Sequence, residues 1–215
     1  MKTTKYKPNS PLTWVTFIFL AFTLVLSLGC VQTRATLKTY IDPSIQTSAV
    51  KTVAVFSMRN TAFSPGETLE MDRAVTQGFV QKNPGVKVIG SGEASRMIND
   101  ANLTSEFSLF LEDFERSGIA NTKFLNKIKG LGADAILQGR LSEITQIDKN
   151  IKLGIRAKTT VTVRYTLLST TNGNILWEGT SNGVKRTYKR FAPPIYEVVS
   201  KAQEKVIGSI PTFGQ

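Results

Sequence analysis

The 215-residue sequence contains no histidine and a single cysteine, Cys30. Without histidine, neither a Ser–His–Asp nor a Cys–His catalytic arrangement can form. One cysteine cannot supply the three or four Cys/His ligands of a zinc site, nor can it close an intrachain disulfide. These absences exclude common hydrolase and zinc chemistries, and we expect no cofactor. Hydrophobic residues still make up 41% of the chain, which is enough for a folded core.

The first 30 residues have the pattern of a secretory signal. Three lysines among the first seven residues precede an apolar run from Leu12 to Gly29, which contains no charged residue. A positive segment, an apolar stretch and a small residue at the cleavage point are typical of such signals. The run ends in Leu26-Ser27-Leu28-Gly29-Cys30, which resembles the lipobox of bacterial lipoproteins.

The lipobox resemblance implies a covalent lipid anchor. In that family the cysteine sulfur receives a diacylglycerol, the signal is removed, and the new N-terminus is acylated with a chain such as palmitate. It therefore predicts a signal peptide over residues 1–29 and lipidation of Cys30. Ser27 departs from the leucine that the family favours three residues before the cysteine. An uncleaved membrane anchor is the alternative, because 18 apolar residues also approach the thickness of a bilayer.

The residue after Cys30 bears on localisation. It is Val31, whereas an aspartate there resembles the inner-membrane retention signal of enterobacteria. The resemblance therefore favours the outer membrane, with the domain facing the periplasm; surface display is the alternative. The net charge of +11 does not indicate nucleic acid in an exported chain, and we expect none as a partner. Lipid head groups and cell-wall polymers are the anions available there, and simple solvation is the other interpretation.

Beyond the signal, the sequence predicts a tether and one folded domain. Residues 30–50 show little hydrophobic period and are rich in Thr, Ser and Gln, which is typical of a tether following the lipidated N-terminus. Residues 51–210 alternate between short β-branched segments and amphipathic helical patterns in the order β-α-β-α-α-α-β-β-β-α. That order predicts an α/β (α+β) domain with a single mixed β-sheet flanked by helices.

Local patterns sharpen this prediction at four places. Within residues 158–168, apolar and polar residues alternate from Thr160 to Leu167, as they do in a strand with one buried face. A change of phase in the preceding strand predicts a bulge near Ser142-Glu143. Asn172-Gly173, between two strands, predicts a type I′ hairpin turn. The aromatic stripe at helical spacing over residues 107–114 is expected in the core.

Two short motifs resemble a family of envelope proteins. Residues 129–139, KGLGADAILQG, are similar to a helix-to-strand junction, and residues 171–177, TNGNILW, to a hairpin. Both occur in periplasmic lipoproteins related to CsgG, LpoB and the N-terminal domain of TolB. Over about residues 51–207, the resemblance implies a non-enzymatic domain that binds other envelope proteins or itself. Regulation of a cell-wall synthase and an accessory role in secretion or assembly are the functions implied.

Two other functions are alternatives, one known in the same family and one based on carboxylate chemistry. A homo-oligomeric secretion ring of the CsgG kind is one, although the link from Asp148 to Lys158 is short and charged, and lacks the apolar face of a membrane-spanning strand. The tether is also shorter than that of LpoB. A cell-wall enzyme using carboxylates, with Glu112, Asp113 and Glu115 as candidates, is the other. We expect no catalytic and no metal-binding residues.

One charge cluster is a candidate contact surface for a partner or an anionic surface. It comprises Lys185, Arg186, Lys189 and Arg190, with Tyr188 and Phe191 interleaved. Cations beside aromatic rings suit a membrane surface. The alternative is an ordinary solvated strand end, since charge runs commonly face water.

Overall fold

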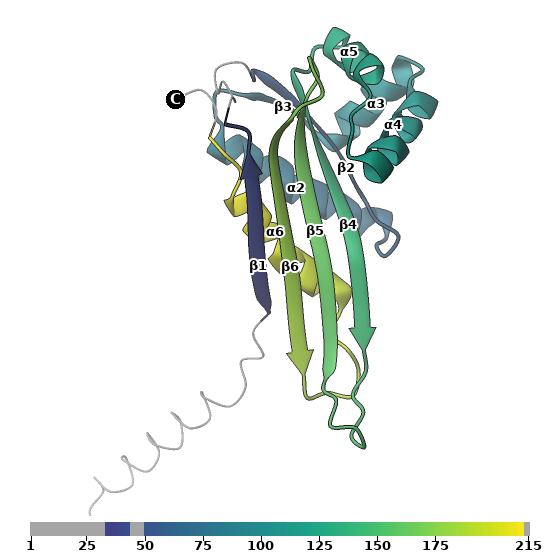
Figure 1. Cartoon of the computed structure of the whole chain (residues 1–215), viewed down its shortest axis with the longest axis vertical. Helices are drawn as coiled ribbons and strands as arrows, with labels where there is room; N and C mark the ends of the chain where they lie inside the picture. The colour runs from purple at the N-terminus through teal and green to yellow at the C-terminus, as the bar shows by residue number, and fades with distance from the viewer. Residues whose placement is uncertain (1–32, 44–49, 213–215) are drawn as a thin grey trace, which may run out of the picture. The chain divides into compact units, whose positions relative to one another are not determined.

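The computed structural model describes residues 33–43 and 50–212. The predicted signal peptide, Cys30 and residues 44–49 of the predicted tether lie outside this part of the chain. Within it, the predicted fold class is confirmed: one mixed six-stranded sheet is flanked by five helices (Figure 1). The predicted order of elements is also found, with one further strand at its start.

The elements are β1 (Arg34–Ile41), β2 (Thr52–Arg59), α2 (Pro65–Lys82), β3 (Lys87–Ile89), α3 (Ser91–Asp100), α4 (Thr104–Ser117), α5 (Thr122–Gly130), β4 (Ala135–Ile147), β5 (Ala157–Ser169), β6 (Ile175–Thr187) and α6 (Ile195–Gly208). The strands lie in the order β1-β6-β5-β4-β2-β3. β2 is parallel to β3 and to β4, whereas β4, β5, β6 and β1 form an antiparallel series. The crossover from β2 to β4 carries helices, as parallel pairing requires.

β1 differs from the sequence-based prediction, which assigned residues 30–50 to a tether. The strand pairs with β6 along its whole length, from Arg34 opposite Val184 to Ile41 opposite Trp177. All but one of its eight residues are exposed. Backbone hydrogen bonds at the edge of the sheet therefore form this strand, and burial of side chains contributes little. A strand of this kind has no hydrophobic period to reveal it.

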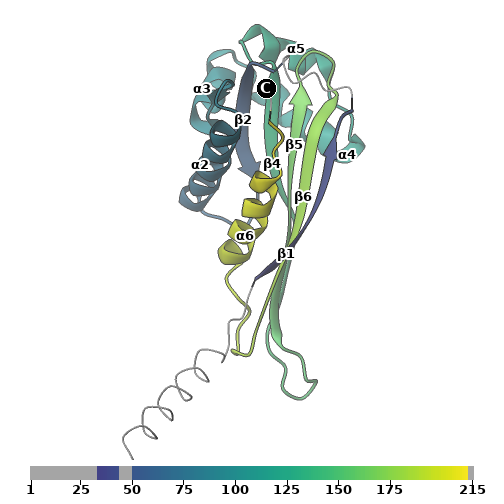
Figure 2. The ribbon, with the colours of Figure 1, turned by 90° about the vertical axis from the view of Figure 1, so that its left-hand side faces the viewer.

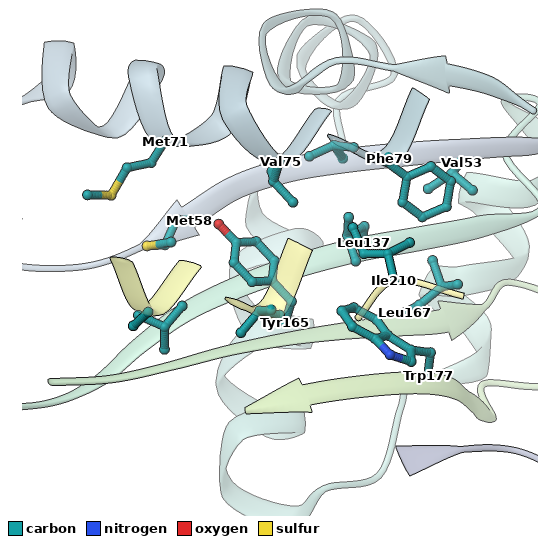
Figure 3. Close-up of a cluster of buried hydrophobic side chains, with 14 of the residues drawn as sticks. Val53, Met58, Met71, Val75, Phe79, Leu137, Tyr165, Leu167, Trp177 and Ile210 are labelled. Atoms are coloured by element: carbon teal, nitrogen blue, oxygen red, sulfur yellow. The ribbon is translucent and has the colours of Figure 1, made fainter. Parts of the chain in front are cut away.

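Helices α2 and α6 cover one face of the sheet (Figure 2). Between them and the strands lies the larger core, in which the rings of Tyr165 and Trp177 are fully buried (Figure 3). α2 begins with a capping box, because the Ser64 side chain accepts from the Glu67 amide and the Glu67 carboxylate accepts from the Ser64 amide. The hydrogen bond that the Ser64 amide donates to the Glu67 carboxylate, followed by a second from the Ser64 hydroxyl (2.8 Å), holds the pKa of Glu67 below its usual value.

Helices α3, α4 and α5 cover the other face only at the end formed by β2, β3 and the start of β4. There the aromatic stripe of α4 enters the second core, where Phe110 stacks on Phe124 with ring centroids 4.8 Å apart. This confirms the stripe as core. Farther along, the same face of β5 and β6 exposes polar side chains such as Arg164 and Asn182. Antiparallel sheets commonly have one face exposed to solvent in this way.

The junction motif of residues 129–139 has the structural role that its sequence suggested. Gly132 has a φ of +97° as the chain leaves α5, a region that glycine enters without strain. Asp134 then accepts hydrogen bonds from the amides of Lys51 (3.0 Å) and Thr52 (2.9 Å). These bonds tie the start of β4 to the start of β2. The predicted bulge is also present, between Leu141 and Glu143.

The predicted hairpin between β5 and β6 is present, but its turn is not of type I′. That type needs a positive φ at both central residues, and of the Asn172-Gly173 pair only Gly173 has one, at +75°. The Ser169 amide donates to the Asn174 carbonyl (2.9 Å), which leaves a longer loop between them. Thr170 holds this loop through its hydroxyl, which donates to the carbonyls of Ala133 and Asp134 at 2.8 Å.

Candidate functional site

The candidate site lies at the end of the sheet opposite the β5–β6 hairpin. β4, β5 and β6 are 13 residues long, so their far ends extend past the part of the sheet that α3, α4 and α5 cover (Figure 1). Two connections meet there: the β4–β5 link, residues 148–156, and the β6–α6 link, residues 188–194. We call these two connections together the distal tip.

The β4–β5 link is an ordered hairpin. Asn150 and Ile155 exchange both backbone hydrogen bonds, at 3.0 and 2.9 Å. Inside this pair, the Asn150 side chain accepts from the Leu153 amide (3.2 Å), and Gly154 turns the chain with a φ of +65°. A closed turn of this kind fixes Ile151 and Leu153 at its end, where both are strongly exposed.

The β6–α6 link is fastened to this hairpin, although about 40 residues separate them in the sequence. The Lys149 amide donates to the Arg190 carbonyl (2.9 Å), and the Ala192 amide donates to the Asp148 carboxylate (2.8 Å). Pro193 is buried, and its carbonyl accepts from the Thr159 hydroxyl at 2.6 Å. Backbone and buried bonds of this kind make the distal tip one structure.

The four cations singled out in the sequence occupy different positions in it. Lys185 is partly buried and forms an ion pair with Glu197 of α6. Arg186 lies on the opposite face of β6, exposed and in register with Lys158 of β5. Lys189 and Arg190 are exposed in the link itself. The structure therefore gives Lys185 a role in fixing α6, places Lys189 and Arg190 on the distal tip, and places Arg186 next to it, exposed near the end of β6.

The structure adds residues that the sequence did not link to this cluster. Lys149, Lys152, Arg156 and Lys158 come from the neighbouring hairpin and strand. The Arg156 guanidinium lies over the Tyr188 ring, 4.3 Å from its centroid. Such cation–π contacts hold a cation beside an apolar surface. The distal tip thus combines cations from two separate segments with the exposed aromatic rings of Tyr188 and Phe191.

The apolar residues of the hairpin were also missed. Ile151, Leu153 and Ile155 alternate with polar residues, a signal that predicts a strand with one buried face. In the structure no such burial occurs, and all three are exposed. The sequence shows that these residues alternate, but it does not show that their side chains are exposed.

Of the three carboxylates proposed for the enzyme alternative, Glu112 is exposed on α4, and Asp113 and Glu115 form ion pairs at the surface. Glu115 lies 3.0 Å from Arg59 and 3.5 Å from Arg140, and Asp113 lies 2.7 Å from Arg116. Elsewhere, the buried Asp72 accepts from the Ser57 hydroxyl (2.7 Å) and the Met58 amide (3.0 Å). Glu115 and Asp72 thus join their helices to neighbouring strands, whereas the Asp113 pair lies within α4. Within residues 33–43 and 50–212, no group of three or more Asp, Glu, Cys or His side chains is placed to hold a metal ion.

Among the described residues, Tyr165 is the one buried side chain with a strongly raised pKa. Burial raises the pKa of its hydroxyl, and the negative charge of Asp72 raises it further. The hydroxyl accepts a hydrogen bond from Gln203 (2.7 Å), whose amide also donates to the Met71 carbonyl (2.8 Å). The shift therefore belongs to a core packing contact between β5, α6 and α2.

Among the described residues, no helix is both long enough and apolar enough to cross a membrane. No family model and no curated protein matches the sequence. Several solved structures have a similar chain path. The PelC dodecamer from Paraburkholderia phytofirmans is 13% identical, with a TM-score of 0.43, over 81% of this chain and 96% of that chain.

Two further structures give comparable values. Lipoprotein GNA1162 from Neisseria meningitidis is 18% identical, with a TM-score of 0.40, over 74% of this chain and 99% of that one. The hypothetical protein CT253 from Chlamydia trachomatis is 9% identical, with a TM-score of 0.44, over 75% and 94%. These are similarities of chain path, and no statement about function rests on them.

Proposed function

We propose that this chain is a lipoprotein of the outer membrane whose domain faces the periplasm and acts as a non-enzymatic interaction or assembly factor of the cell envelope. The observation that carries the proposal is the place of Cys30. It directly follows the apolar signal pattern, and it precedes the first strand of the folded domain, which begins at Arg34. The only cysteine thus stands where a lipid is attached in the lipoproteins that the signal resembles.

The tether of this proposal is shorter than the sequence predicted, because β1 already begins at Arg34. Three residues, 31–33, lie between Cys30 and Arg34, and the four steps from one Cα atom to the next span at most about 14 Å. A lipid on Cys30 would therefore hold the domain close to one membrane surface. Confinement of this kind raises the effective concentration of the domain for a partner in the same membrane. Reach across the cell-wall layer, as in LpoB, does not fit so short a connection.

A second candidate, assembly of several copies, is favoured by the edges of the sheet. β1 is an outermost strand of the sheet. On the other side, pairing of β4 with β2 ends at Arg140 opposite Arg59, so β4 continues past its partner. Exposed strand edges are templates for pairing with another chain. The size of the complex extracted in mild detergent tests this candidate, and a monomer there contradicts it.

The lipid anchor is tested by intact mass of the membrane-extracted protein. We expect the mature chain to begin at Cys30 and to carry a diacylglycerol and an acyl chain. Cys30→Ala is the control and should release the processed domain or leave the signal uncut. If the wild-type protein carries no lipid and Cys30→Ala stays equally membrane-bound, the proposal is wrong.

The interaction role is tested by capture of crosslinked partners from envelopes. Wild type should retain specific envelope proteins that Cys30→Ala retains less, because its domain is no longer confined to the membrane. The enzyme alternative is tested by replacing Glu112, Asp113 and Glu115 together with their amides. A cell-wall-degrading activity of the wild type that this triple variant loses would favour the enzyme.

A further inference from the structure

We propose that the distal tip docks on the glycerophospholipid surface to which Cys30 is attached, with the side chains at its end inserted among the lipids. Three lines of observation lead there: exposed apolar residues, an excess of cations, and the direction of the chain. The third rests on the proposed lipid anchor, whereas the first two do not.

Large apolar side chains are concentrated at the end of the distal tip. Ile151 is 81% exposed, Leu153 70% and Phe191 65%. Hydrogen bonds within the hairpin and between the two links hold the main chain around these three residues, so the residues belong to an ordered turn and link. Contiguous exposed apolar residues mark interaction surfaces. Tyr188, also exposed, has the ring and hydroxyl that suit the boundary between lipid and water.

Cations surround this apolar end. Residues 148–158 and 185–191 contain eight lysines and arginines but one acid, Asp148. Lys158 and Arg186 lie opposite each other on adjacent strands, set back from the turn. Lys152 lies at the end itself, between Ile151 and Leu153, whereas the other cations of the hairpin lie outside its closed turn of residues 150–155. Apolar residues at the end with most of the cations behind them match the layers of a bilayer surface, where acyl chains lie beneath anionic head groups. Long basic side chains can also extend toward the head groups while their stems lie along apolar surface.

The direction of the chain places the lipid beside the distal tip. β1 is antiparallel to β6, so it begins where β6 ends: Arg34 lies opposite Val184, which in turn lies opposite Thr160 of β5. From Thr160 to Ile155 the hairpin runs five residues farther, or about 17 Å. Cys30 lies at most about 14 Å from Arg34. A domain held upright by a lipid on Cys30 therefore brings the distal tip into the membrane surface.

The test places a fluorescent label on the distal tip of the full-length protein. Leu153→Cys is labelled in vesicles of phosphatidylethanolamine and phosphatidylglycerol, with Cys30 acylated. The matched control is Ile119→Cys, because Ile119 is also an apolar residue, 73% exposed. It lies at the opposite end of the sheet, next to Ala120, which approaches the β5–β6 hairpin at Gly173.

The readout compares brominated lipids with aqueous iodide as quenchers. We expect brominated lipids to quench the label at residue 153 at least twice as strongly as the label at residue 119, and iodide to show the reverse order. Equal iodide quenching at both sites would overturn the proposal. Protection of residue 153 from both quenchers would also overturn it, since a protein partner or a second copy would then cover the distal tip.

A second variant tests whether the apolar side chains cause the insertion. Ile151→Ser combined with Leu153→Ser should at least halve the lipid quenching of a label at Phe191→Cys, with no change in melting temperature, because both side chains are exposed. Ile119→Ser is its control. Unchanged quenching in the double variant would contradict the proposal.

Failure of this inference is distinguishable from failure of the lipid anchor. Intact mass reports acylation of Cys30 in the same sample. An unlipidated protein would contradict the proposed function. A label at residue 153 that stays exposed to water in an acylated protein would contradict only the docking of the distal tip.

Discussion

Gly139 provides a direct test of how the sheet packs beneath α2 and α6. It lies opposite Tyr165 in the β4–β5 pair. A Cβ atom at this position would lie 2.5 Å from Cε1 of the Tyr165 ring and 3.0 Å from its Cζ. The ring has little room to retreat, because it is fully buried and its hydroxyl is held by Gln203. We therefore expect Gly139→Ala to destabilise the domain.

The magnitude follows from two opposing terms. Overpacking a well-packed core costs about 1–3 kcal/mol. Replacing glycine returns roughly 0.5–1 kcal/mol, because the unfolded chain loses conformational freedom. At the midpoints of these two ranges the net loss is about 1 kcal/mol, which lowers the melting temperature of a domain of this size by about 2–4 °C. Thermal unfolding followed by circular dichroism measures this shift.

Two matched variants make the reasoning refutable. Gly92→Ala lies in α3, where an added Cβ meets no atom within 4 Å, so it should keep or raise the melting temperature. In a Tyr165→Leu background, which lacks the clashing ring atoms, Gly139→Ala should cost much less than in wild type. An equal cost in both backgrounds would refute the packing explanation.

Two other predictions concern single side chains of the domain. Asp134→Ala removes the acceptor of the Lys51 and Thr52 amides. It should lower the free energy of unfolding, measured in urea, by about 1–3 kcal/mol, and Asp134→Asn should lower it less. An alanine variant as stable as wild type would contradict this prediction. Burial raises the pKa of Tyr165 above its ordinary value, so the folded state keeps this proton where the unfolded chain loses it. Its contribution to stability is constant below about pH 10 and falls above it. Tyr165→Phe should flatten that alkaline loss, and identical pH profiles would contradict the assignment.

The helices and central strands were predictable because their side chains are buried on one face. The alternation of residues 158–168 and the aromatic stripe of residues 107–114 both report burial directly. The stripe was confirmed as core. The alternation was confirmed as far as Tyr165, beyond which Thr166 and Leu168 on the other face are buried as well. The capping box at Ser64 was equally visible, since its two partners lie three residues apart. Local and periodic signals of this kind need no knowledge of distant neighbours.

β1 and the hairpin turn were not predictable for the opposite reason. β1 exposes nearly all its side chains, and its existence depends on a partner strand about 140 residues away. The turn at Asn172-Gly173 has the sequence of a type I′ turn, but Thr170 bonds to the β4 junction and lengthens the loop. At both places, contacts with a distant part of the chain determined the local structure.

For the candidate site, the chemistry of the residues can be read from the sequence: one cysteine after an apolar signal, no histidine, and four cations at residues 185–190. Which of these residues lie together became clear from the fold. There Lys185 forms an ion pair with α6, the link that carries Lys189 and Arg190 is bonded to the hairpin of residues 148–156, and Arg186 lies opposite Lys158 of β5. The physical reason is that antiparallel pairing brings distant loops to one end of a sheet, a relation that no local pattern contains.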